Sequence, residues 1–218
     1  MGVKERHERE REATARAILD AARDLFVAEG YGNVSIRKIA ERIEYSPAAI
    51  YSYFASKDDI FLALAEEGFH MLAQSAESAR QSDRHGATDC IRAAFLNLYQ
   101  FSEAHPEYHA LMFLDRSVPK ISQDWERFGF VRELRKQLTD LIAQAVADGD
   151  FPADSNPEVI FRVLMVATQG VCAMRICDRL VPGEDAEALA RVTIEAALTG
   201  LRTGFTHSYH PVSPDSCH

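Results

Sequence analysis

The sequence predicts an all-α fold with a small helical domain at the N-terminus and a larger helical domain after it. Apolar residues recur with helical spacing along the chain, no alternating stretch of useful length predicts a strand, and turn residues separate the periodic stretches. The chain has 218 residues, of which 47% are hydrophobic. It is therefore long enough to bury a sizeable core and too apolar to be disordered throughout.

The N-terminal region predicts three short helices in succession. An apolar stripe runs from Ile18 to Phe26 and ends at the turn residues 30–33. Ser35 is a good N-cap for the second helix, and Ser46, followed by a proline at the first helical position, is a good N-cap for the third. Two short helices joined by a tight turn, with a third packed before them, are the plan of a helix-turn-helix, although a generic three-helix bundle has the same periodicity.

Longer helices are expected in the rest of the chain. A fourth helix opens at Ser56, and the polar stretch 82–87 follows it. Further helices are expected over residues 88–105, 106–115, 122–148, 157–180 and 185–203. The predicted organisation is a charged arm over 1–11, a domain over 12–72 with its helix-turn-helix at 35–54, a helical domain over 73–205, and a disordered tail over 206–218.

Charge and composition limit the possible locations of the protein. The net charge is −9, yet residues 1–58 contain equal numbers of basic and acidic side chains, so charge alone does not decide for or against a nucleic-acid partner. The longest uncharged apolar run, Val163–Met174, is too short to span a membrane, and the charged N-terminus is unlike a signal peptide. A cytoplasmic protein without membrane partners is expected, with reduced thiols at Cys90, Cys172, Cys177 and Cys217.

Four linked segments of the N-terminal region resemble a known family. These are Ile18–Phe26, Glu29–Gly32, Ser35–Ala40 and Ser46–Phe54, followed by Ser56-Lys57. Together they closely resemble the N-terminal domain of the tetracycline-repressor (TetR) family over about residues 12–72. A weaker resemblance to one subgroup of that family continues over Tyr99–Phe113. The resemblance implies a homodimeric transcriptional regulator that binds a palindromic operator in double-stranded DNA and is released by a small apolar or aromatic ligand.

The resemblance also implies roles for individual residues. Arg37 matches a position that contacts a base in some members, and a guanidinium can bond guanine O6 and N7 together. Tyr53 and Lys57 match positions that hold phosphates. The outward side of the third helix would enter the major groove. The full set of predicted DNA contacts is Ser35, Arg37, Ser46, Pro47, Ala48, Ala49, Tyr51, Ser52, Tyr53 and Lys57.

One residue departs from the family pattern in the turn of the helix-turn-helix. Glu44 stands where the family usually has a glycine. A left-handed backbone there would cost a non-glycine residue about 1 kcal/mol. Two alternatives remain open from the sequence, a right-handed turn or a mildly strained Glu44, and they give the third helix different tilts.

The C-terminal half contains candidates for a ligand pocket and a dimer interface. Aromatic and methionine side chains with a few polar groups suit an apolar ligand, and the same residue types also fill ordinary cores. The pocket candidates are Tyr99, Met112, Phe113, Trp125, Phe128, Phe161, Met165, Gln169 and Cys172. Small and apolar residues of the last two helices would permit close helix packing across a two-fold axis. The interface candidates are Val166, Gly170, Leu189, Ala196 and Gly200.

Other classes of function have less support. None of the common catalytic or nucleotide-binding motifs is present, so we expect neither an enzyme nor a cofactor, although a helical enzyme remains an alternative. His105 and His109 are four residues apart, but Pro106 places a helix boundary between them, so no metal site is expected. The other alternative to a ligand-released repressor is a TetR-like protein whose C-terminal domain binds a protein partner instead of a small ligand.

Overall fold

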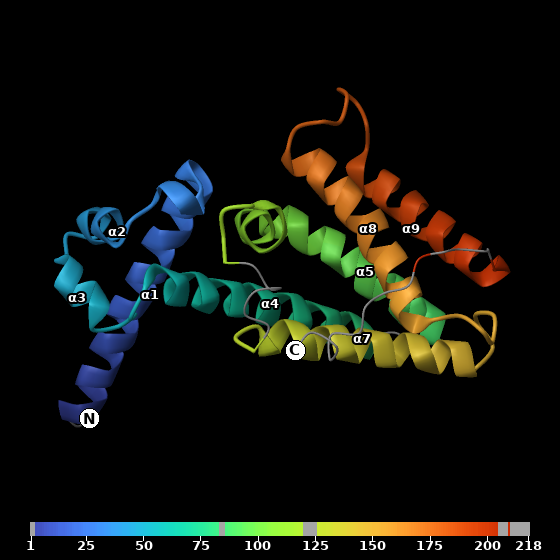
Figure 1. Cartoon of the computed structure of the whole chain (residues 1–218), viewed down its shortest axis with the longest axis horizontal. Coiled ribbons are helices and arrows are strands. Elements are labelled where there is room, and N and C mark those ends of the chain that lie inside the picture. Colours follow the sequence, from blue (N-terminus) through green and yellow to red (C-terminus); the bar gives the residue numbers. More distant parts are fainter. Residues whose placement is uncertain (1–2, 83–85, 120–125, 205–208, 210–218) are drawn as a thin grey trace. The chain divides into compact units, whose positions relative to one another are not determined.

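The computed structural model describes residues 3–82, 86–119, 126–204 and 209, and across these residues the chain is helical, with no strand (Figure 1). The predicted all-α fold is confirmed. Contacts divide the chain into two units, one formed by Met1–His70 with His105–Gly129, and the other by Met71–Ala104 with Phe130–His218. Residues 105–129 thus pack with the N-terminal region, although the sequence assigned them to the second domain.

The first unit is built around three helices that precede α4. Its elements are α1 (Val3–Glu29), η1 (Tyr31–Asn33), α2 (Ile36–Arg42), α3 (Pro47–Tyr51), the first half of α4 (Lys57–Ser82), α6 (Pro106–His109) and the π-helical turn η2 (Ala110–Leu114). Ile18 of α1, Ile39 of α2 and Ile50 of α3 are fully buried, as is Leu64 of α4. The apolar spacing in the sequence therefore turns one face of each helix toward a common core. The charged residues 3–11, predicted as an arm, are the first turns of α1.

The segment α6–η2 packs closely against α4 in this unit. A Cβ at Gly68 would lie 2.5 Å from the Met112 sulfur and 3.0 Å from the Tyr108 ring, so a larger residue there would require the Met112 side chain to shift. Glu67, which precedes Gly68, joins three helices of this unit. It accepts a hydrogen bond from the Tyr108 hydroxyl (2.8 Å) and two from the Arg16 guanidinium (2.8 and 2.7 Å). This network joins α1, α4 and α6.

The second unit contains the longer helices of the C-terminal half. These are α5 (Ala87–Ala104), α7 (Gly129–Ala147), α8 (Pro157–Ile176) and α9 (Ala186–Thr203). Helices α5, α8 and α9 pack on one another in pairs, and α7 contributes Ile142 and Ala145 to the same core. The other buried members of that core are Ile91, Phe95, Phe151, Ile160, Phe161, Leu164, Ile194, Leu198 and Leu201. Burial of these large apolar side chains is the main stabilising contribution.

Two predicted helix boundaries were wrong. The helix expected from residue 122 begins at Gly129, because residues 126–128 form a turn, and residues 120–125 lie outside the described part. The helix expected to reach residue 180 ends at Ile176, because Asp178 adopts a left-handed backbone (φ 54°) and Arg179 N donates to the Met174 carbonyl (2.7 Å). That bond pattern closes a helix. The expected tail lies outside the described residues, apart from Tyr209.

Helix α8 is, within the described residues, the one helix long and apolar enough to cross a membrane by length and composition. The core helix of a soluble protein has the same length and apolar composition. Seven of its side chains are buried inside the second unit, including Phe161, Leu164 and Val171. The apolar character of α8 is thus used at least partly for packing inside the protein.

Candidate nucleic-acid interface

Helices α2 and α3 form a helix-turn-helix whose ends are defined by local capping. Ser35 Oγ accepts a hydrogen bond from Lys38 N (3.3 Å), and Ser46 Oγ accepts one from Ala49 N (3.1 Å). Pro47 occupies the first position of α3. Both predicted N-caps are present, and each satisfies a backbone N–H that the helix itself cannot pair.

The turn between α2 and α3 contains a left-handed residue. Glu44 has φ 60°. Its N–H donates to the Glu41 carbonyl (3.3 Å), and Tyr45 N–H donates to the Ala40 carbonyl (2.9 Å). These two bonds form a Schellman motif, in which the left-handed position favours glycine. The structure therefore decides between the two alternatives for Glu44: the turn keeps the glycine-type backbone and Glu44 carries the strain.

The outward side of α3 is small and exposed, apart from one aromatic residue. Ile50 is fully buried, whereas Pro47 and Ala48 are exposed and Tyr51 is 54% exposed. Ala49 is half-buried. The hydroxyl of Ser52, at the end of α3, donates to the Ala49 carbonyl (2.7 Å). A short helix with one buried anchor and an exposed outer face has the shape required for insertion into a major groove.

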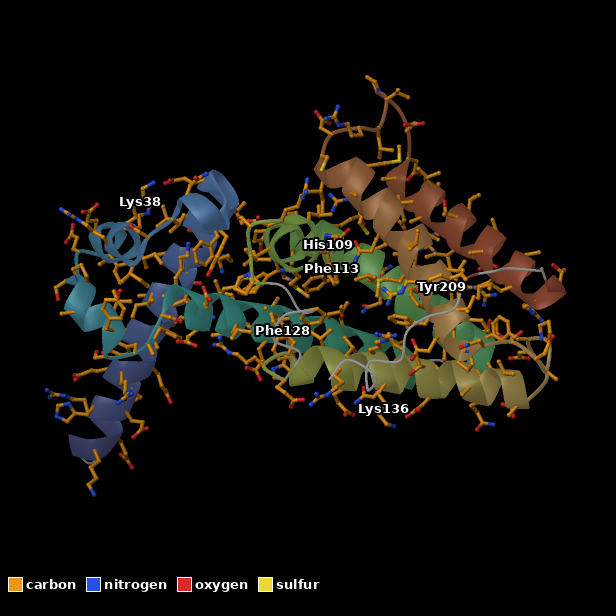
Figure 2. All side chains as sticks on the ribbon, viewed as in Figure 1. Lys38, His109, Phe113, Phe128, Lys136 and Tyr209 are labelled. Atoms are coloured by element: carbon orange, nitrogen blue, oxygen red, sulfur yellow. The ribbon has the colours of Figure 1, made fainter. Side chains whose placement is uncertain are left out.

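Basic residues of α2 lie next to this face. Arg37 is the more exposed, with 81% of its side chain accessible, and its Nε donates to Glu41 (3.0 Å). Lys38 points out from α2 (Figure 2), where it pairs with Glu29 and donates to the Asn33 carbonyl (3.3 Å). The Arg37–Glu41 pair is exposed and contributes little to stability, so a base can compete for the guanidinium.

The predicted phosphate contacts have partners within the protein. Lys57 Nζ donates to the backbone carbonyls of Tyr31 (2.9 Å) and Val34 (3.0 Å), and it lies 4.0 Å from the centre of the Tyr31 ring. An ammonium group has three N–H donors, so one is left for a phosphate. Tyr53 is half-buried, and the Arg11 guanidinium lies over its ring at 5.8 Å.

The structure places two residues beside this surface that the sequence analysis did not select. Arg11 reaches Tyr53 from α1, and Tyr45 is an exposed aromatic residue directly before the α3 N-cap. Arg11 lies in a run of alternating charges, where no spacing distinguishes it from its neighbours. Only the fold brings it to the end of α3.

The pocket candidates fall into both units. Met112, Phe113 and Phe128 belong to the first. The Phe113 ring lies 4.8 Å from the His109 ring (Figure 2) and 5.6 Å from the Phe69 ring. Trp125 lies outside the described residues. The remaining five, in the second unit, are Tyr99, Phe161, Met165, Gln169 and Cys172.

Several candidates in the second unit have clear structural roles. Phe161 is part of the main core, and Met165 packs against it. Tyr99 is fully buried, and its hydroxyl donates to Glu103 (2.7 Å). Burial, followed by this hydrogen bond, raises the pKa of Tyr99. Burial likewise raises the pKa of the Cys172 thiol, which is therefore a poor nucleophile.

Gln169 differs from the other candidates because both polar atoms of its side chain are buried and neither has a hydrogen-bond partner among the described residues. A buried amide without partners is costly. A hydrogen bond from a polar group of a ligand to the Gln169 amide would offset that cost.

The interface candidates lie on α8 and α9. Val166 of α8 is 64% exposed, and Gly170 and Ala196 are also exposed. Nothing lies within 4 Å of a Cβ built at Gly170 or at Gly200. Leu189 differs from them, because it packs inward against Tyr99, Val171, Cys172 and Ala190.

Within the described ranges, no group of three His, Cys, Asp or Glu side chains could hold a metal ion. His109 is fully buried with its ring against Phe113, and His105 packs edge-on to the Tyr108 ring (6.3 Å). The two histidines thus contact different aromatic residues.

Sequence comparisons agree with this geometry. Residues 18–64 match the family of bacterial regulatory proteins described as the tetR family. The chain is 30% identical to the HTH-type transcriptional repressor Rv1474c of Mycobacterium tuberculosis over 181 residues, which cover 83% of this chain and 89% of the relative. It is 32% identical to the HTH-type transcriptional repressor AcnR of Corynebacterium diphtheriae over 176 residues, covering 80% and 85%.

Solved structures share the fold at low sequence identity. The fatty acid degradation regulator FadR of Bacillus halodurans matches with a TM-score of 0.71 at 17% identity, covering 86% of this chain and 96% of that one. FadR of Bacillus subtilis, solved in complex with stearoyl-CoA, matches with a TM-score of 0.69 at 16% identity, covering 85% and 98%. With the matching helix-turn-helix and the two curated relatives, the chain belongs to the TetR family and is a DNA-binding transcriptional repressor, not an enzyme.

Proposed function

We propose that the protein acts in the cytoplasm as a homodimeric repressor that binds a palindromic operator and is released by a small apolar ligand. The observation that carries the DNA-binding part is the outer face of α3, where Pro47, Ala48 and Tyr51 are exposed above the buried anchor Ile50. The alanines offer apolar contact to a thymine methyl, and Arg37 on α2 offers a bidentate contact to guanine.

A two-fold protein fits a palindromic operator because each protomer places one reading helix in one half-site. The exposed apolar stripe on α8 and α9 supports the dimer. Val166 and Met174 on α8 and Val192 on α9 are large apolar side chains with 64%, 41% and 65% exposure. Gly170 is one helical turn from both Val166 and Met174, and Ala196 is one turn after Val192; both are small and exposed, which leaves room for a partner helix. Covering this stripe with the same stripe of a second copy would remove its apolar surface from water.

An apolar effector is supported by the aromatic and methionine-rich residues of the C-terminal half and by two proteins of similar fold. FadR of Bacillus subtilis was solved in complex with stearoyl-CoA, and KstR2 of Mycobacterium tuberculosis is a ketosteroid transcriptional regulator. The mechanism would be a shift between two states of the dimer. In the DNA-binding state the two reading helices are spaced for successive major grooves, about 34 Å apart, and the ligand favours a state with another spacing.

The test starts with a duplex selected from a random library by the full-length protein. A palindromic selected site supports the dimeric repressor, and failure to enrich any sequence would contradict specific DNA binding. Arg37→Ala should relax preference at one base pair per half-site by about 1–3 kcal/mol. Equal losses on every sequence would instead make Arg37 a phosphate contact.

Release is then measured with stearoyl-CoA and a ketosteroid as first probes, at concentrations where they bind the free protein. A true effector must weaken operator binding, and the operator must weaken effector binding by the same factor. A protein that binds its operator but responds to no apolar compound would favour the alternative of a protein partner for the second unit.

A further inference from the structure

We propose that Arg11 adds a phosphate contact beside the one expected of Tyr53, through which the N-terminal turns of α1 hold the DNA backbone at the end of the recognition helix. This inference rests on the proposed DNA-binding function and adds to it a second element of the chain. The matched family region covers residues 18–64, so Arg11 lies outside it.

The carbon at the centre of the Arg11 guanidinium lies 5.8 Å from the middle of the Tyr53 ring. Tyr53 itself is held at the end of α3, because its N–H donates to the Ile50 carbonyl (2.9 Å) and Ile50 is the buried anchor of that helix. The ring therefore positions the guanidinium next to the DNA-facing helix. An aromatic ring attracts the cation but takes up none of its five N–H donors.

Ion pairs occupy several basic side chains of α1 and α2. Arg6 pairs with Glu10 (3.1 Å), Arg16 with Glu67, and Arg37 with Glu41. Arg11, by contrast, takes part in no ion pair with any residue that the structure describes. Within the described residues no carboxylate therefore occupies its guanidinium, although acidic residues precede and follow Arg11 in the sequence.

The Arg11 guanidinium and the Tyr53 hydroxyl are two donors on neighbouring side chains, and a phosphate oxygen accepts charge-assisted hydrogen bonds from both types. Phosphates line both edges of the major groove that α3 would enter. A contact of this kind is independent of sequence, so it should strengthen binding to every duplex and fix the register of α3 without adding base preference.

The experiment compares Arg11→Ala with Arg6→Ala in the full-length protein. Both substitutions remove one arginine from the same exposed stretch of α1, and alanine keeps the helix. Binding is measured on the selected operator and on a random-sequence duplex between 50 and 200 mM salt. Circular dichroism and the size of the protein in solution confirm that fold and assembly are unchanged.

Arg11→Ala should weaken binding to both duplexes by the same factor. It should also make the slope of log affinity against log salt less steep by about 0.9 for each bound protomer. Between 50 and 200 mM salt the variant should therefore lose about 3.5-fold less affinity per protomer than the wild-type protein. Arg6→Ala should have the same slope as the wild-type protein. Tyr53→Phe keeps the ring that positions Arg11 and should therefore keep most of the Arg11 effect, whereas Tyr53→Ala should lose it.

The results that would overturn the inference differ from those that would overturn the proposed function. If the wild-type protein binds the operator and Arg11→Ala has the wild-type affinity and slope, the Arg11–Tyr53 contact serves the structure of the protein alone. If Arg6→Ala lowers the slope as much as Arg11→Ala, net charge accounts for the effect and no site exists at Arg11. If the wild-type protein binds no duplex, the DNA-binding function itself fails.

Discussion

The Lys57 ammonium lies 2.9 Å from the Tyr31 carbonyl oxygen and over the ring of the same residue. Lys57 opens α4, and Tyr31 belongs to the turn η1 that leads into α2. A side chain expected to hold a phosphate is thus also a brace between the turn before the helix-turn-helix and the helix after it. The two roles are compatible because one N–H of the ammonium remains for DNA.

Replacing Lys57 should therefore affect both stability and DNA binding. Lys57→Met keeps the aliphatic stem and removes the charge. It should lower the free energy of unfolding by about 1 kcal/mol, since two carbonyls lose a charged donor at a half-exposed position. It should also lower the salt slope by about one unit for each bound protomer. Urea unfolding and salt titrations measure the two effects.

Lys136→Met is the matched control, because Lys136 is an exposed lysine of α7 (Figure 2) that pairs with Asp140 (2.6 Å). It removes the same charge and should change neither quantity appreciably. If Lys57→Met has the stability and the salt slope of the wild-type protein, Lys57 neither stabilises the fold nor contacts a phosphate.

Glu44 offers a test of backbone strain in the recognition turn. Its φ of 60° costs a residue with a Cβ about 1 kcal/mol. Glu44→Gly should relieve that cost and raise the free energy of unfolding by a few tenths to about 1 kcal/mol, since the freer unfolded chain offsets part of the gain. The control Arg42→Gly lies in α2 with helical backbone and should lower stability by about 1 kcal/mol. Two changes of the same sign would argue against the left-handed turn.

Gly68 tests the close packing of α4 against α6 and η2. A methyl group there would meet the Met112 sulfur at 2.5 Å and the Tyr108 ring at 3.0 Å. Gly68→Ala should therefore destabilise the protein by about 1–3 kcal/mol despite the better helix propensity of alanine. Gly86→Ala, where a Cβ meets nothing within 4 Å, is the control and should be close to neutral. Thermal unfolding of both variants gives the comparison, and a neutral Gly68→Ala would show that Met112 moves aside freely.

Gly200→Arg tests the proposed dimer. No atom lies within 4 Å of a Cβ at Gly200, so a side chain can begin there without a clash in an isolated chain. In a dimer through α8 and α9 the same arginine would be desolvated without a partner, which costs several kcal/mol. Sedimentation at micromolar concentration should show monomers that bind the operator poorly. Gln137→Arg adds the same charge at an exposed position of α7 and should remain dimeric. A dimeric Gly200→Arg protein would place the interface elsewhere.

The hydrogen bonds of Asp115 should make the free energy of unfolding fall in acid. Burial raises the pKa of its carboxyl, but hydrogen bonds from the Ser117 hydroxyl and N–H and from Tyr31 N–H outweigh that effect, so the net pKa is lowered. A lowered folded-state pKa contributes stability that is present above the unfolded value, near 3.9, and is lost as the pH falls through the folded value. Asp115→Asn should lose that contribution at neutral pH and flatten the stability curve below about pH 4. Unfolding curves that keep the wild-type acid dependence would assign the loss to other carboxylates.

Much of this protein is determined by local sequence. Ser35, Ser46 and Pro47 place the ends of α2 and α3 because a cap or a proline acts on backbone groups within three residues of itself. Gly149, whose left-handed backbone follows α7, ends that helix in the same way. The helical spacing of the apolar residues then determines which face of each helix is buried. These caps and apolar residues also make up the family pattern over Ile18–Lys57.

Other features depend on contacts between residues far apart in the chain. The sequence left the backbone of Glu44 open, because two turn geometries have the same residue spacing, and the bond from Tyr45 to Ala40 decides between them. Asp115 binds Tyr31 across 84 residues and thereby joins residues 105–129 to the N-terminal unit. Arg11 meets Tyr53 only because α1 and α3 share one core. Helical periodicity tells which face of a helix is buried but not which other helix covers it, so tertiary packing alone decided these pairings.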